Sequence, residues 1–169
     1  MIEVRPLTGD ELAEHLPALA VLRIAVFSDY PYLYDGDAEY EHRYLAEYAA
    51  APNAVLVAAF EERGFDTGKL FYFGESVLLP RYRGHGIGHA FFDHREDAAR
   101  KAGAEAAIFA SVIRADNHPD RPHDYRPLSD FWTKRGYAPV EGLISQLAWK
   151  EHGEESESHK PMQYWMRAL

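Results

Sequence analysis

Cysteine is absent from the sequence, which excludes disulfide bonds, thiolate metal sites and a cysteine nucleophile. Basic residues are scarce, because 18 Lys and Arg stand against 27 Asp and Glu and give a formal net charge of -9. Nucleic-acid binding needs clustered Lys and Arg, so we expect no nucleic-acid partner. No apolar run approaches the roughly 18 residues of a membrane span, and residues 1–6 lack the apolar run of a secretory signal. We therefore expect a cytoplasmic protein that binds no membrane.

Length and hydrophobic content predict a single domain over residues 1–169, since 47% of the residues are hydrophobic and no repeat or linker interrupts the chain. Apolar periodicity and turn residues predict helices over 12–26, 38–50, 87–102 and 128–135, and strands over 2–7, 54–60, 70–79, 106–113, 143–149 and 162–166. The segment 70–113 is expected to form a parallel strand, helix and strand crossover, and the last two strands an antiparallel hairpin. The sequence therefore predicts an α/β (α+β) fold with a mixed sheet.

A glycine-rich turn stands where the strand over 70–79 gives way to a helix, and it reads Arg83-Gly84-His85-Gly86-Ile87-Gly88-His89. Glycines let the main chain approach a ligand closely, and the free N–H groups and dipole of a helix start favour a phosphate. A Walker turn would need Lys-Ser or Lys-Thr after the last glycine, and the dinucleotide pattern would need glycine in place of His89. The alternative is a turn that only allows close packing of strand and helix.

The turn resembles the Arg/Gln-x-x-Gly-x-Gly/Ala motif of the GCN5-related N-acetyltransferase (GNAT) family, here Arg83 to Gly88. A second segment, Phe131 to Tyr137, is similar to the aromatic pair, charged residue and Gly-aromatic step of that family. The order of predicted elements also matches over nearly the whole chain. The resemblance implies a central mixed, mostly antiparallel sheet with one parallel splayed strand pair, flanked by about four helices.

The resemblance further implies that the chain uses acetyl-coenzyme A as cosubstrate and acetylates a primary amine of a small molecule or peptide by direct attack in a ternary complex. The main chain of the turn would bind the coenzyme diphosphate, and the main chain of Leu78 and Leu79 would pair with the pantetheine arm. Asn117 would contact the coenzyme; the alternative is an ordinary asparagine of a loop turn. The implied cofactor-binding residues are thus Leu78, Leu79, Arg83, Gly84, His85, Gly86, Ile87, Gly88, His89 and Asn117.

Glu75 is the candidate general base, because an ammonium with a pKa near 10.4 must lose a proton before it attacks and family members often carry a carboxylate on this strand. The alternative is a structural carboxylate paired with an arginine. Family members often hold a tyrosine general acid where Trp132 stands, so no general acid is assigned: Tyr125, Tyr137 or Tyr164 could take this role, or the thiolate could leave unassisted. Trp132 is expected to be a core residue or part of the cofactor wall and not a reactive group.

Tyr30, Tyr32 and Tyr34 lie in the segment between the first two helices, which in this family lines the acceptor side. They predict an aromatic acceptor wall; the alternative is packing of this loop onto the body. Of nine histidines only His85 and His89 share a four-residue spacing, so no metal is expected. The family usually places three strands between the second helix and the turn, whereas only 54–60 and 70–79 are found.

Two other functions stay open at this stage. One is a coenzyme A binding or sensor module that has lost acetyl transfer, favoured by Trp132 and the shortened sheet. The other is a nucleotide-binding domain. Exposed edge strands in the C-terminal hairpin are compatible with a homodimer.

Overall fold

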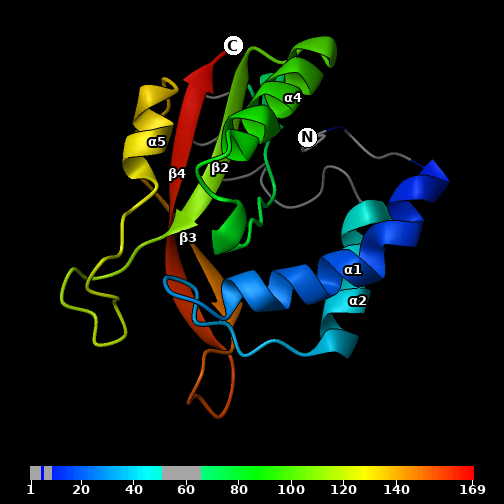
Figure 1. Cartoon of the computed structure of the whole chain (residues 1–169). Coiled ribbons are helices and arrows are strands. Elements are labelled where there is room, and N and C mark those ends of the chain that lie inside the picture. The colour runs from blue at the N-terminus through cyan, green and yellow to red at the C-terminus, as the bar shows by residue number, and fades with distance from the viewer. Residues whose placement is uncertain (1–4, 6–8, 51–65) are drawn as a thin grey trace.

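The computed structural model describes residue 5 and residues 9–50 and 66–169 (Figure 1). The strands expected over 2–7 and 54–60, and with them the question of a missing strand, lie outside these residues. The first helix, α1, covers Gly9–Phe27 and contains Pro17, and α2 covers Ala38–Ala50. Asp37 begins α2, because its Oδ1 accepts hydrogen bonds from the N–H groups of Glu39 (2.6 Å) and Tyr40 (3.0 Å). Both predicted helices are confirmed, and they pack on each other.

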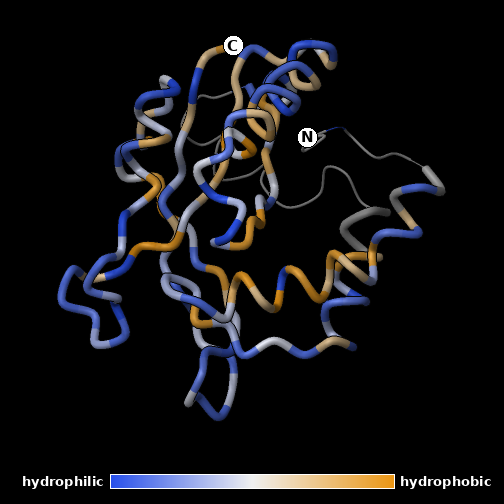
Figure 2. The backbone as a smooth tube through the Cα atoms, in the orientation of Figure 1, coloured by the Kyte–Doolittle hydropathy of each residue, from blue (hydrophilic) through white to orange (hydrophobic). Residues whose placement is uncertain are grey.

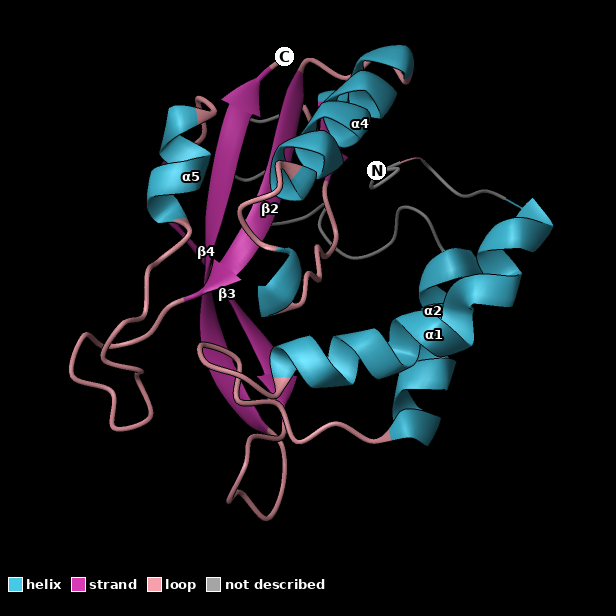
Figure 3. Ribbon diagram, viewed as in Figure 1, coloured by secondary structure: helices cyan, strands magenta, loops and turns pink. Residues whose placement is uncertain are grey.

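The described sheet has the order β1-β2-β4-β3. Figure 3 shows its strands in magenta. Its strands are β1 (Leu70–Tyr72), β2 (Ala106–Val112), β3 (Ala138–Trp149) and β4 (Ser158–Ala168). β1 pairs parallel with β2, and the other two pairs are antiparallel, which confirms the mixed sheet. β3 and β4 are longer than predicted. β3 pairs with β4 on both sides of a register shift between Pro139 and Ile144, and the extra residues of β4 pair with the end of β3 and the start of β2. Since β4 lies inside the sheet, only β3 of the hairpin is an edge among the described strands.

The predicted strand over 70–79 is wrong beyond Tyr72. Phe73 still donates its N–H to the carbonyl of Ile108 (2.7 Å), but the chain then leaves β2. An arginine of α4 (Ile87–Lys101) holds the departing segment instead: Arg95 donates to Ser76 Oγ (2.5 Å) and to the main-chain carbonyl of Glu75. An apolar run of strand length therefore contributes only three residues to the sheet, since a strand also needs a neighbour for its main chain.

Helices α4 and α5 (Ser129–Lys134) bring aromatic rings onto the sheet. Phe92 of α4 contacts Phe109 of β2 (ring centroids 5.7 Å apart) and Tyr137 (5.4 Å) in a buried cluster. A second cluster forms around Ile108, which precedes Phe109 on β2 and therefore faces the opposite side of the sheet. Figure 2 shows hydrophobic residues along α1 and the sheet, whereas the loop before α5 and the connection from β3 to β4 are hydrophilic.

Candidate functional site

The glycine-rich turn exposes main-chain N–H groups at the start of α4. It follows a short 3-10 helix over Pro80–Tyr82, and Gly84 and Gly86 both have φ of 79°, a conformation that favours glycine. Gly86 is the N-cap of α4, and a Cβ at either glycine would meet no atom within 4 Å. No described residue accepts a hydrogen bond from the main-chain N–H groups of 84–89. These groups and the helix dipole form a site that suits a diphosphate.

The side chains of the turn point in different directions. His85 turns back, so that its Nδ1 lies 2.9 Å from the carbonyl oxygen of Arg83. His89 packs toward α5, with its ring 4.9 Å from that of Phe131 and its Nδ1 3.2 Å from Arg135 Nη1. A ligand at the turn would therefore meet the main chain of both histidines, while the exposed Arg83 side chain supplies positive charge.

The segment before the turn offers further main-chain groups. Leu78 and Leu79 are half-buried, and no described residue accepts a hydrogen bond from their N–H groups. The carbonyl of Leu79 accepts a hydrogen bond from the N–H of Tyr82 (2.9 Å). The carbonyl of Leu78 has no hydrogen-bond donor among the described residues. An extended ligand with amide groups could pair here as an added strand would. Asn117 lies in the exposed loop after β2.

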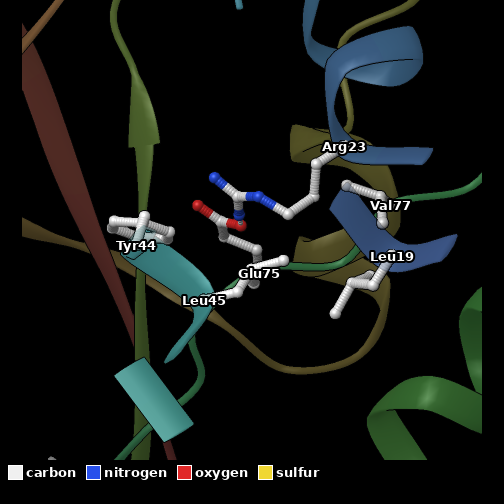
Figure 4. A pocket seen from close by; sticks show the side chains of 6 residues that line it. All are labelled: Leu19, Arg23, Tyr44, Leu45, Glu75 and Val77. Atoms are coloured by element: carbon white, nitrogen blue, oxygen red, sulfur yellow. Dashed lines mark ion pairs between the residues drawn. The ribbon is translucent and has the colours of Figure 1, made fainter. Parts of the chain in front are cut away.

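Glu75 forms an ion pair with Arg23 of α1 (Figure 4). Arg23 Nε also donates to Oε2 of Glu41 on α2 (2.5 Å), and Arg23 and Glu41 are only 6% and 0% exposed. The Glu75 side chain keeps 37% of its exposure, so this carboxylate remains open to a ligand. The arginine partner expected for a structural carboxylate is thus present, and Glu75 is also accessible enough to take part in chemistry.

Two cavities meet at this ion pair. One, of about 110 Å³, is lined by the residues drawn in Figure 4 and reaches Val77, next to the segment that leads to the turn. The other, of about 120 Å³, extends toward Trp149 at the end of β3. Arg23, Tyr44 and Glu75 line both cavities. Glu75 therefore lies between an aromatic cavity and the approach to the glycine-rich turn.

The loop between α1 and α2 brings two of its three tyrosines into the larger cavity. Tyr32 and Tyr34 line that cavity, whereas Tyr30 does not and packs its ring 4.7 Å from that of Tyr125. The loop is tied to β3, because Trp149 Nε1 donates to the carbonyl of Tyr32 (3.0 Å). Arg114 also donates from Nε to the carbonyl of Pro31 (2.6 Å). This loop thus packs onto the body of the protein and also lines the cavity, so both alternatives for its tyrosines apply.

Both cavity tyrosines are protonated at neutral pH, and burial raises their pKa further above it. Burial raises the pKa of Tyr32 to about 12, with a further contribution from Tyr125. Burial also raises the pKa of Tyr34, and a hydrogen bond to the Glu41 carboxylate adds to the effect. Neither phenol is therefore a base, and Tyr34 stabilises Glu41.

Trp132 packs between two aromatic rings, as expected for a packing residue. Its ring centroid lies 5.0 Å from that of Phe109 and 5.1 Å from that of Trp165. Trp165 Nε1 donates to Ser111 Oγ (3.1 Å), which fixes the outer ring. Trp132 therefore contributes to the aromatic layer under α5.

Sequence reasoning missed several residues of the site. Arg23, Glu41 and Tyr44 were expected only as parts of two amphipathic helices, and Arg95 as part of a third. One signal was available, because Arg23 stands between Leu22 and Ile24 in the apolar part of its helix. A charge in such a place is buried only with a partner. Its partner Glu41 could not be identified from spacing alone.

The described part of the chain contains neither a metal-binding cluster nor a membrane-spanning helix. No group of three or more His, Cys, Asp or Glu residues in it could hold a metal ion. Within the same residues, no helix combines the length and the apolar character needed to cross a membrane.

Comparisons with known proteins place these features in context. The model of the family described as "Acetyltransferase (GNAT) family" matches residues 23–122. The mycothiol acetyltransferase of Rothia mucilaginosa is 31% identical over 104 residues, which cover 62% of this chain and 27% of that protein. The chain thus spans only about a quarter of the length of this curated relative.

Solved structures share the fold. A ribosomal-protein-alanine N-acetyltransferase from Brucella melitensis superimposes with a TM-score of 0.61 at 14% identity, over 99% of this chain and all of its own. The YncA protein of Salmonella typhimurium, solved with its cofactor acetyl-CoA, gives a TM-score of 0.52 at 9% identity, over 92% of this chain and 89% of its own. At these identities the likeness shows a common fold.

Proposed function

Because the chain belongs to the acetyltransferase (GNAT) family, we propose that it transfers the acetyl group of acetyl-coenzyme A to a primary amine of a small molecule or peptide. The observation that carries this proposal is the row of main-chain N–H groups over 84–89, which have no described acceptor and lie at the start of α4. Such a row binds a diphosphate without needing a metal or a basic cluster.

In this proposal the donor lies along the chain that precedes the turn. The N–H groups of 84–89 bind the diphosphate, Arg83 adds a cation, and the main chain of Leu78 and Leu79 pairs with the pantetheine amides. Asn117 is a proposed contact from the neighbouring loop. The thioester end would then point toward Val77 and the smaller cavity, where Glu75 lies.

Glu75 is the proposed base of the reaction. It takes a proton from the acceptor ammonium, and the freed amine attacks the thioester carbonyl directly, in a ternary complex. Main-chain N–H groups near Leu78 and Leu79 stabilise the oxyanion. Acetyl-coenzyme A supplies the acetyl group: the new N–C bond forms as the C–S bond breaks, and coenzyme A leaves as a thiolate that takes up the second proton, which the nitrogen loses as it becomes an amide. A thiol with a pKa near 8.5 can leave without a dedicated acid.

Two glycines with the same backbone conformation allow a controlled test. Gly86 in the turn has φ of 79° and Gly103 after α4 has φ of 80°, and a Cβ at either would meet no atom within 4 Å. Substitution by alanine therefore imposes a similar strain of about 1 kcal/mol at both positions. We expect Gly86→Ala to weaken coenzyme A binding at least tenfold in calorimetry and Gly103→Ala to leave it unchanged.

The outcomes separate the competing functions. Wild-type protein that binds coenzyme A and releases thiol from acetyl-coenzyme A with an amine supports the proposal. Binding without thiol release across an amine panel would favour the sensor module. Equal weakening by both alanine variants would overturn the proposed diphosphate site. Thermal protection by ATP and not by acetyl-coenzyme A would overturn the acetyltransferase function and favour the nucleotide-binding domain.

A further inference from the structure

The larger cavity has a volume of about 120 Å³, and its lining is mainly aromatic. Six aromatic rings from four parts of the chain line it. They are Phe27 of α1, Tyr32 and Tyr34 of the loop after it, Tyr40 and Tyr44 of α2, and Trp149 of β3. Tyr40 and Tyr44 are nearly parallel, with ring planes 13° apart and centroids 6.5 Å apart. Flat rings of this kind favour an apolar or aromatic body, and their faces favour a cation.

The lining of the two cavities carries few charged side chains, and more of them are acidic than basic. Among the described residues that line the two cavities, one guanidinium, that of Arg23, faces two carboxylates, those of Glu41 and Glu75. The lining therefore carries an excess of one negative charge. Arg23 contacts both carboxylates and lies over the ring of Tyr44, 4.7 Å from its centroid. A carboxylate on an acceptor would therefore find no uncommitted cation in this lining.

Only one of the two carboxylates is accessible to an acceptor. Glu41 is fully buried, and its two oxygens lie 2.5 Å and 3.4 Å from nitrogens of Arg23. Glu75 is 37% exposed and lines both cavities. One ammonium can therefore be neutralised here, whereas a second ammonium on the same acceptor would meet aromatic rings and the guanidinium.

The size of the space sets a second limit. An apolar cavity of about 150 Å³ can hold a benzene ring, so a cavity of about 120 Å³ that opens to solvent is matched to one ring. Leu147 of β3, which is 56% exposed, stands at its rim. A ring on a short alkyl chain would fill the cavity and bring its ammonium to Glu75.

We propose that the acceptor is a monocationic primary amine on a compact aromatic body, without a carboxylate and without a second ammonium. This inference rests on the proposed acetyltransferase function and names the substrate class of the same site. Glu75 pairs with the ammonium before it takes the proton, and the aromatic rings select the body. The excess negative charge excludes amino acids, and the single accessible carboxylate disfavours polyamines.

A panel of three acceptors tests the proposal by thiol release from acetyl-coenzyme A. 2-Phenylethylamine carries the expected features, phenylalanine adds only a carboxylate, and spermidine replaces the ring with further ammonium groups. We expect kcat/KM for 2-phenylethylamine to exceed that for each of the others at least tenfold. A preference for phenylalanine or spermidine would overturn the acceptor class and leave the acetyltransferase function standing. Absence of thiol release with every amine would overturn both.

A charge placed at the rim provides a second, independent test. Leu147→Lys adds a cation to the cavity, and Ile144→Lys adds the same charge to the same strand at a residue that is 50% exposed and lines neither cavity. We expect Leu147→Lys to lower the ratio of kcat/KM for 2-phenylethylamine over phenylalanine several-fold, with KM for acetyl-coenzyme A unchanged. Ile144→Lys is expected to leave the ratio as in the wild type. An unchanged ratio in Leu147→Lys, or an equal change in both variants, would contradict the inference.

Discussion

Replacing Arg23 by methionine is expected to destabilise the protein far more than the loss of an ordinary ion pair. The Arg23 and Glu41 side chains are 8% and 1% exposed, and Glu41 accepts a hydrogen bond of 2.5 Å from Arg23 Nε. Methionine keeps much of the apolar stem but leaves Glu41 as an uncompensated buried charge. Removing one partner of such a pair typically costs about 3–5 kcal/mol. Urea unfolding, with a linear extrapolation to water, measures this loss directly.

Two further variants test whether burial of the ion pair causes this loss of stability. Lys69→Met breaks an exposed pair, since the Lys69 and Glu105 side chains are 50% and 67% exposed, and it is expected to lower the free energy of unfolding far less than Arg23→Met does. Adding Glu41→Leu to Arg23→Met removes the orphaned charge and is expected to recover a large part of the lost stability. If Arg23→Met costs no more than Lys69→Met, or if the double variant is less stable than the single one, burial of the pair does not act as argued.

Three other predictions concern the base, the hairpin and the core. Glu75→Gln is expected to lower kcat at least tenfold and to abolish the fall in rate at acid pH, while calorimetry still detects coenzyme A; unchanged kinetics would remove Glu75 from the mechanism. Hydrogen bonds from Lys160, then from Ser158, lower the pKa of Glu154 from 4.5 to about 2. Stability from this carboxylate is therefore complete above pH 4.5 and is lost as the pH falls toward 2, a dependence that acid unfolding should find reduced in Glu154→Gln. Tyr137→Phe removes a hydroxyl 3.1 Å from Glu96 Oε1, and urea unfolding should show a loss of about 1 kcal/mol.

The turn and the helix after it were predictable because local chemistry fixes them. Arg100 and Lys101 in the last turn and Gly103 beyond it are typical of a helix end, and α4 ends at Lys101 with Gly103 at a φ of 80°. The strand over 70–79 was not predictable to its end. Its apolar residues indicate burial, and Val77 is indeed buried, but pairing depends on a neighbouring main chain that the sequence does not specify.

The glycine-rich half of the candidate site could be predicted, whereas the cavity could not. A phosphate-binding turn needs contiguous residues with special backbone conformations, so it leaves a readable motif. The pair of Arg23 and Glu41 joins residues 18 apart on different helices, and its burial results from the packing of α1 on α2. Arg23 stands in the apolar part of its helix, but Glu41 alone looks like an exposed charge on an amphipathic helix. The same holds for Arg95, which reaches from α4 to the carbonyl of Glu75.

The position of Glu75 depends on both ends of the site. Its side chain is held by Arg23 from α1, and its main-chain carbonyl by Arg95 from α4, the helix that begins at the glycine-rich turn. Because residues 74–79 have left β2, these two arginines replace sheet hydrogen bonds as the described anchors of Glu75. A shift of α1 would move the Glu75 carboxylate relative to the aromatic cavity, and a shift of α4 would move its main chain relative to the turn. In the proposed reaction the two guanidinium groups would therefore set the distance between the acceptor amine and the thioester, and the proposed base would not need to lie on a strand.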